Sequence, residues 1–239
     1  MSGGYLAYRE FALEFPADLR LGLNLGFYRT FAVPSIAAVL AGTGKMVARP
    51  KERAKATGTL MFTLIERGMD GPDGRLAVAQ LKRTHARLAV GNDEFVYVLA
   101  AFCVTPVRWI DAHGRRKTTV GEKRAAHGFY AELGARMGIE GVPDSFDALA
   151  DWMDDFERRA FAVTPEGRAL WGATRGLLAG RFPRPLAPLV RAAADALLDD
   201  RLRDALATPR PSAAVRMLLA TVLAARARWW RLIASGRGG

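Results

Sequence analysis

Residues 92–110 read NDEFVYVLAAFCVTPVRWI and contain the most apolar run in this chain of 239 residues. The pattern predicts a helix over 94–110, with Asn92 or Asp93 as its N-terminal cap. Because so few polar side chains interrupt the run, we expect this helix to lie at the centre of the fold. Pro106 is expected to kink the helix or to end it early.

The same run contains Cys103, the only cysteine in the sequence. A single cysteine excludes an intramolecular disulfide and is typical of a reducing compartment. The apolar neighbours of Cys103 predict a buried, inert thiol rather than a nucleophile. The N-terminus lacks the features of a secretory signal, and no run of about 18 uncharged apolar residues predicts a transmembrane helix. We therefore expect a cytoplasmic protein that can associate with a membrane.

Further helices are predicted on both sides of the central one, separated by Gly and Pro. The predicted segments are 17–31, 50–67, 75–89, one that starts after Thr119, about 144–159, one that starts after Thr164, 186–207 and 212–234, with a short apolar turn at 35–40. Thr119 and Glu122 form a capping box, and Thr164-Pro165 pairs an N-cap with an N1 proline. No alternating strand pattern occurs. We expect an all-α, single-domain fold of about ten helices.

Charge is distributed unevenly along the chain. The net charge is +11, and residues 158–239 hold 15 arginines against 5 acidic residues. This excess could favour an anionic membrane surface, or it could be a solvated surface of biased composition. Residues 226–231, RARWWR, combine cations and aromatic rings as interfacial helices do, which predicts peripheral membrane contact by the C-terminal helix. No recognition motif supports nucleic-acid binding, and we expect no nucleic-acid partner.

Three histidines are present, His85, His113 and His127. His85 falls on the predicted inward face of its helix, near Leu81 and Leu88, where an imidazole is either a core residue with satisfied nitrogens or a metal ligand. The spacing of the histidines does not suit zinc, but one histidine in an apolar helical environment is sufficient for a haem. His113 is expected to end a helix, and His127 to be superficial or half-buried.

Two other features could carry chemistry. Arg53 and Thr57 are four residues apart and share one helical face, so they could bind a propionate or an oxygen ligand, or could be an exposed Arg and a packed Thr. The acidic residues between Asp144 and Glu157 have helical spacing, which is typical of a solvated amphipathic helix. No nucleophile-elbow, phosphate-loop or dinucleotide-binding motif occurs.

Several strings, taken together and in order, resemble the MpaB-like oxygenases, the family that includes the rubber oxygenases. They are FPAD (15–18), FYRTFAVPSI (27–36), TG (43–44), Arg53 with Thr57, HAR (85–87), NDEFVY (92–97), PVRWID (106–111) and GARMGI (134–139). The resemblance covers about residues 9–210, which would form the catalytic domain. Residues 211–239 would then form a basic amphipathic helix packed on that body.

The resemblance implies a b-type haem, with its iron bound by His85 as axial ligand and with Arg53 and Thr57 in the haem pocket as cofactor-binding and catalytic residues. It also implies an oxygenase that takes O2 and an apolar, isoprenoid-like substrate. The sequence departs from the rubber oxygenases in two respects. No Asp or Glu lies between Asp18 and Glu52, where those enzymes carry a base, and Ala56 replaces the lysine before the threonine. These departures leave a non-catalytic haem or hydrophobic-ligand binding protein as the alternative.

Overall fold

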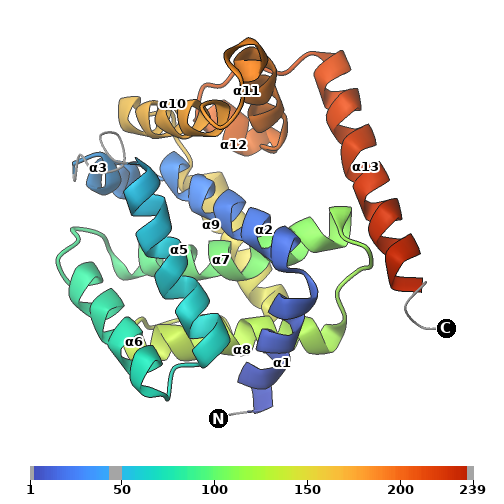
Figure 1. The fold of residues 1–239 in the computed structure, drawn as a ribbon. Coiled ribbons are helices and arrows are strands. Elements are labelled where there is room, and N and C mark those ends of the chain that lie inside the picture. Colours follow the sequence, from blue (N-terminus) through green and yellow to red (C-terminus); the bar gives the residue numbers. More distant parts are fainter. Residues whose placement is uncertain (1–2, 43–49, 236–239) are drawn as a thin grey trace.

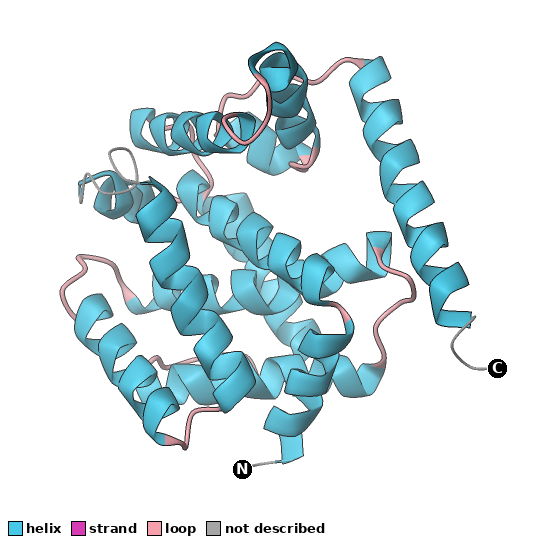
Figure 2. Cartoon of the chain, viewed as in Figure 1, coloured by secondary structure: helices cyan, strands magenta, loops and turns pink. Residues whose placement is uncertain are grey.

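The computed structural model of the protein describes residues 3–42 and 50–235, with side chains at 4–42 and 58–233. These residues form helices and no strand, which confirms the predicted all-α class (Figures 1 and 2). The elements are α1 (Gly3–Glu14), α2 (Pro16–Arg29), η1 (Thr30–Ala32), α3 (Pro34–Gly42), α5 (Pro50–Arg67), α6 (Pro72–His85), α7 (Asn92–His113), α8 (Val120–Met137), α9 (Phe146–Ala160), α10 (Pro165–Ala179), η2 (Arg184–Leu186), α11 (Ala187–Ala196), α12 (Asp200–Ala205) and α13 (Ala213–Ser235).

The central position of α7 is confirmed, because most of its residues from Val96 to Ile110 are buried. Helix α2 crosses α7 at close range, with two glycines at the crossing. A Cβ atom at Gly22 would lie 2.3 Å from Pro106 Cα, and one at Gly26 would lie 2.5 Å from the carbonyl oxygen of Ala101. The expectation that Pro106 might end the helix is wrong, since α7 continues to His113. Packing against Gly22 holds the helix where the missing N–H would otherwise weaken it.

Helix α7 is also long and apolar enough to cross a membrane by length and composition. However, 67% of its most apolar 18 residues are buried inside the structure. Burial of this extent accounts for the apolar composition by core packing alone.

Local signals predicted several helix ends correctly. The predicted bounds of α5 agree with the structure, and α8 begins with the reciprocal capping box of Thr119 and Glu122. Ser145 caps α9, and Thr164 caps α10 with Pro165 at its first turn. For α8, α9 and α10 the signal is a side chain that bonds a backbone N–H within three residues, so it does not depend on the rest of the fold.

Other predicted ends are wrong. Helix α6 begins at Pro72 and ends at His85 instead of spanning 75–89, and residues 35–40 belong to helix α3 rather than a turn. The N-cap of α7 is Gly91, because the side-chain amide of Asn92 bonds the backbone of Glu140 in both directions, at 2.8 and 3.0 Å. The predicted helix 186–207 is broken into η2, α11 and α12. Helix α1 was not predicted.

In the part of the chain whose side chains are described, the buried ones form two clusters. The larger surrounds α7 and includes residues of α1, α2, α5, α8 and α9. The smaller lies beneath α10 to α12, where Trp171 and Leu202 pack against Phe31 and Ala37. Helix α13 packs on α11 and, more lightly, on the end of α7, and Figure 1 shows it along one side of the molecule. The division of the chain into a body and a C-terminal helix stays a prediction.

Candidate functional site

A mostly apolar cavity of about 220 Å³ lies between α7 and the helices α3, α5, α6 and α8. Its walls carry aliphatic, aromatic and thioether side chains. They include Ile36, Val39, Leu40, Leu60, Met61, Leu81, Leu88, Phe95, Val98, Leu99, Phe102, Leu133 and Met137. The helices that supply them are far apart in the sequence, so only the folded chain creates the cavity. Such a lining suits an apolar ligand.

His85 lies in the wall of this cavity as the last residue of α6. Its Nδ1 is 2.7 Å from the carbonyl oxygen of Leu81. Because a carbonyl oxygen can only accept, Nδ1 carries the proton, and in the neutral ring Nε2 then carries the lone pair. A second hollow of about 300 Å³ also borders His85 and shares Phe95, Met137 and Ile139 with the cavity. The imidazole therefore stands between two hollows.

These features fit a haem. Among the described residues no group of three or more His, Cys, Asp or Glu side chains could hold a metal ion. A haem needs only one such side chain, because the porphyrin supplies four nitrogens. Axial histidines bind through one ring nitrogen while the other donates to a carbonyl or carboxylate, and the bond from His85 Nδ1 to the Leu81 carbonyl is of this second kind. The ring of Phe95 packs edge-on against the imidazole, with centroids 5.6 Å apart, and restrains its orientation.

Glu94 is the one carboxylate among the described residues that line the cavity. It lies in the first turn of α7 and accepts a hydrogen bond of 3.0 Å from the Ser35 hydroxyl of α3. Sequence reasoning missed Glu94, because a glutamate in the first turn of a helix is explained by the helix dipole alone. Only the approach of α3 to this turn places the carboxylate beside the cavity.

Two buried tyrosines form a hydrogen-bonded pair, of which one member lies in the wall of the cavity. Tyr130 lines the cavity, and the Tyr8 hydroxyl donates to its oxygen at 3.4 Å. Burial raises the pKa of both phenols, so both stay protonated at neutral pH. Cys103 is buried as predicted, and burial likewise raises the pKa of its thiol.

Arg53 and Thr57 belong to α5, but their side chains lie outside the described residues. Position 57 is one helical turn before Met61, which lines the cavity. Their expected part in the haem pocket stays a prediction.

The other two histidines lie away from the cavity. His113 is the last residue of α7, as expected, and its ring centroid is 4.2 Å from that of Trp109. Burial and the nearby Arg226 lower its pKa. His127 Nε2 donates to the carbonyl oxygen of Pro143 at 2.6 Å and is half-buried. Each of these rings has a structural explanation.

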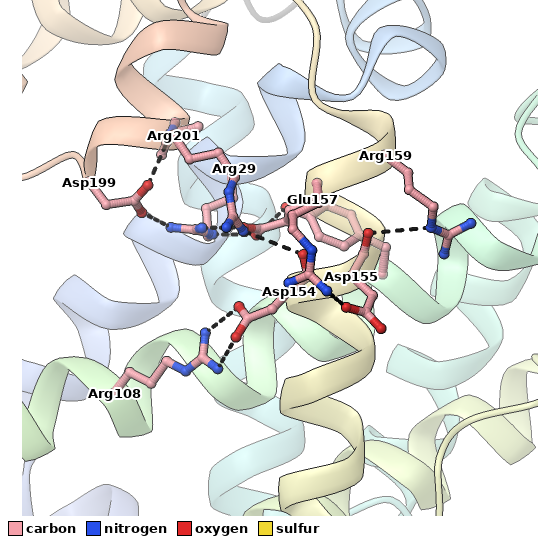
Figure 3. A network of polar contacts seen from close by, with 11 residues as sticks. Arg29, Arg108, Asp154, Asp155, Glu157, Arg159, Asp199 and Arg201 are labelled. Atoms are coloured by element: carbon pink, nitrogen blue, oxygen red, sulfur yellow. Dashed lines mark hydrogen bonds and ion pairs between the residues drawn. The ribbon is translucent and has the colours of Figure 1, made fainter.

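A charged cluster joins α2, α9 and α12 at a different place in the fold (Figure 3). Glu157 is fully buried, and Arg29 binds both of its carboxylate oxygens, with Nε 2.6 Å from Oε1. Tyr97 donates to the same carboxylate at 3.0 Å, and Arg29 also pairs with Asp199. The expectation that the acidic residues of α9 are solvated is therefore wrong for Glu157. Its partner Arg29 is 128 residues away, so the spacing of α9 could not reveal the pair.

Comparison with known proteins identifies the family. The catalytic-domain family described as ER-bound oxygenase mpaB/B'/Rubber oxygenase matches residues 16–229. The chain is 26% identical to the ER-bound oxygenase mpaB' of Penicillium brevicompactum, over 93% of this chain and 57% of that protein. It is 27% identical to the ER-bound oxygenase mpaB of the same organism, over 76% of this chain and 51% of that protein. The chain thus spans little more than half the length of these two relatives. The family match covers most of the sequence, including every element that forms the cavity, and the chain belongs to the mpaB/rubber-oxygenase family of catalytic domains.

Proposed function

We propose that the chain binds a b-type haem in the cavity, with His85 Nε2 as the axial ligand of the iron, and acts as an oxygenase. Its substrates would be O2 and an apolar molecule of the isoprenoid class. The observation that carries this proposal is the His85 imidazole in the wall of an apolar cavity, with Nδ1 donating to the Leu81 carbonyl. Membership of an oxygenase family supports the activity, and the apolar lining supports the substrate class.

When bound, a haem supplies one-electron and O2 chemistry that amino-acid side chains cannot perform. The contribution of the chain is to bind, orient and exclude water. The Leu81 carbonyl fixes the tautomer of His85, and Phe95 restrains its ring plane. The aliphatic wall holds an apolar chain and keeps water from the reacting atoms. Arg53 and Thr57 are proposed to bind a propionate or to orient O2.

Glu94 is proposed as the proton acceptor of the reaction. The sequence has no carboxylate between Asp18 and Glu52, where the rubber oxygenases carry their base. Glu94 provides a carboxylate at the cavity from a different helix, held in place by the Ser35 hydroxyl. Its Oε2 would accept a proton from the bound substrate, while Oε1 keeps the hydrogen bond to Ser35.

The haem is tested by the absorption spectrum of the purified protein. We expect a Soret band that is lost in His85→Gly and restored when imidazole is added, because the free base can occupy the vacated position. His113→Ala and His127→Ala are the matched controls and should keep the band. A colourless protein that takes up no haemin would contradict the proposal, as would a Soret band unchanged in His85→Gly.

Activity is tested by oxygen uptake with polyisoprene or farnesyl-type substrates. Glu94→Gln should lower kcat by about 10²- to 10⁴-fold, the usual contribution of a general base, while the Soret band persists. Glu140→Gln removes an exposed carboxylate and is the control. The lack of a carboxylate between Asp18 and Glu52 favours one alternative, a haem or hydrophobic-ligand binding protein without turnover. Sustained oxygen uptake excludes that alternative, and a Soret band without any uptake supports it.

A further inference from the structure

Helix α13 exposes large apolar side chains along one face. Leu218, Val222 and Trp229 are 51%, 54% and 63% exposed, and Leu232 is exposed as well. Their positions are separated by four, seven and three residues, so they lie on one stripe of the helix. From Leu218 to Leu232 the stripe is about 21 Å long at the helical rise per residue. An exposed apolar surface of this extent is characteristic of an interaction site.

The opposite face of α13 already packs against the body. Ala227 is buried, and the helix contacts α11 and the end of α7. Arg226 pairs with Asp18 of α2, and Asp18 also accepts a hydrogen bond of 3.0 Å from Trp109 Nε1 of α7. The exposed stripe therefore faces away from the body, and its exposure is fixed by these contacts.

The charge of α13 has one sign. The helix contains four arginines and no acidic residue, and Arg216, Arg228 and Arg231 are exposed. The adjoining segment repeats the combination of apolar side chains and cations. It exposes Phe182, Leu186 and Leu189 together with Arg181, Arg184 and Arg191, and its helix α11 packs on α13.

We propose that the stripe of α13 docks on an anionic lipid surface, with Trp229 in the headgroup region and Arg228 against the lipid charges. Interfacial helices have this composition, an apolar face with aromatic residues beside a row of cations. A second copy of the chain is disfavoured, because pairing two such stripes would bring the arginines of both copies together without any acidic partner. An anionic surface satisfies the apolar stripe and the cations at once.

The proposal is tested by flotation of the full chain with vesicles of phosphatidylcholine and phosphatidylserine at 7:3, compared with phosphatidylcholine alone. Binding should favour the anionic vesicles and fall as salt is raised. Val222→Gln/Trp229→Gln should weaken binding by about tenfold or more through loss of buried apolar surface. The control is Leu76→Gln/Val120→Gln, which changes two side chains of similar exposure, 68% and 66%, outside the C-terminal helices.

Charge is tested separately by Arg228→Glu against Arg83→Glu, both being exposed arginines. The first variant should weaken binding to anionic vesicles by about tenfold or more, and the second variant should not. Equal binding of both stripe and control variants would overturn the proposal. So would concentration-dependent dimerisation in sedimentation that Val222→Gln/Trp229→Gln abolishes, without vesicle binding by the parent chain. The Soret band of all these variants should match that of the parent, which separates this proposal from the haem.

Discussion

Around α7 the helices meet through apolar side chains and glycines, whereas the helices after Ala160 combine a smaller apolar cluster with ion pairs of arginines. Gly22 and Gly26 let α2 approach α7 within contact of its backbone. By contrast, Arg29 links α2 to Glu157 and to Asp199 at the N-terminus of α12, and Arg226 links α13 to Asp18. The cavity lies in the first region and the excess positive charge in the second. We infer that packing sets the stability of the cavity, while ion pairs add to apolar packing in the attachment of the C-terminal helices.

The largest effect is expected at the buried ion pair. Glu157→Gln leaves the buried Arg29 with only part of its charge compensated, so we expect the free energy of unfolding to fall by about 3–5 kcal/mol. Urea denaturation at pH 7 measures it. The control is Asp155→Asn in the same helix, which removes an exposed pair with Arg158 and should cost less than about 1 kcal/mol. Similar losses in both variants would show that the buried ion pair stabilises the fold no more than the exposed one.

The apolar region is tested at the crossing of α2 and α7. Gly22→Ala places a methyl group 2.3 Å from Pro106 Cα. Because this is a backbone atom, it cannot move away by a side-chain rotation. We expect the free energy of unfolding to fall by about 1–3 kcal/mol in the same denaturation measurement. Gly128→Ala in α8 is the control, because a Cβ atom there meets nothing within 4 Å. It should be neutral or stabilising by up to about 1 kcal/mol. A neutral Gly22→Ala would contradict the close packing of the two helices.

The two regions also differ in how far the sequence reveals them. The bounds of α5 and the capping boxes follow from Pro50, Gly68, Thr119 and Glu122, residues that act on their own neighbours. The central place of α7 follows from its apolar composition, and the inward position of His85 from helical spacing, although its helix ends sooner than expected. These features are local, so the sequence is sufficient to predict them.

The remaining features depend on partners that are distant in the sequence. Burial of Glu157 requires Arg29 and Tyr97, and the place of Glu94 at the cavity requires Ser35 of α3. Spacing within α9 or α7 carries no information about these partners. The prediction of a haem rests on the resemblance of residues 85–111 to the family and on the cavity. His85 alone is not sufficient, because one histidine in an apolar stripe is compatible with an ordinary core.

A change of pH should separate the two regions. Burial would raise the pKa of Asp199, but the nearby Arg29 and the backbone N–H of Leu202 outweigh it, so the pKa lies below the usual 3.8. A carboxyl with a lowered pKa contributes stability that is present above 3.8 and is lost as the pH falls through its folded value. Asp199→Asn should therefore be less stable than the parent at pH 6, and the difference should close below about pH 4.

Denaturation curves between pH 6 and pH 3 measure this difference. Asp204→Asn serves as the control for the loss of one negative charge. It removes an exposed carboxylate from α12, the helix that Asp199 caps, without removing an ion pair between described residues. A gap between parent and Asp199→Asn that stays constant to pH 3 would mean that the Arg29–Asp199 pair contributes nothing to the attachment of α12.

The smallest effect is expected at α13. Arg226→Gln removes the pair with Asp18, and because the Arg226 side chain is partly exposed, the free energy of unfolding should change by less than about 1 kcal/mol. Asp18 keeps its hydrogen bond from Trp109, so α2 and α7 stay joined and only the hold on α13 is lost. Limited trypsin digestion should therefore cut α13 faster, while the Soret band and the denaturation midpoint stay close to those of the parent. Arg228→Gln also removes one trypsin site, but from an exposed arginine, and should leave the rate of cleavage at the remaining sites unchanged. Equal cleavage rates in the two variants would place the attachment of α13 in its contacts with α11 instead of in the Asp18 pair.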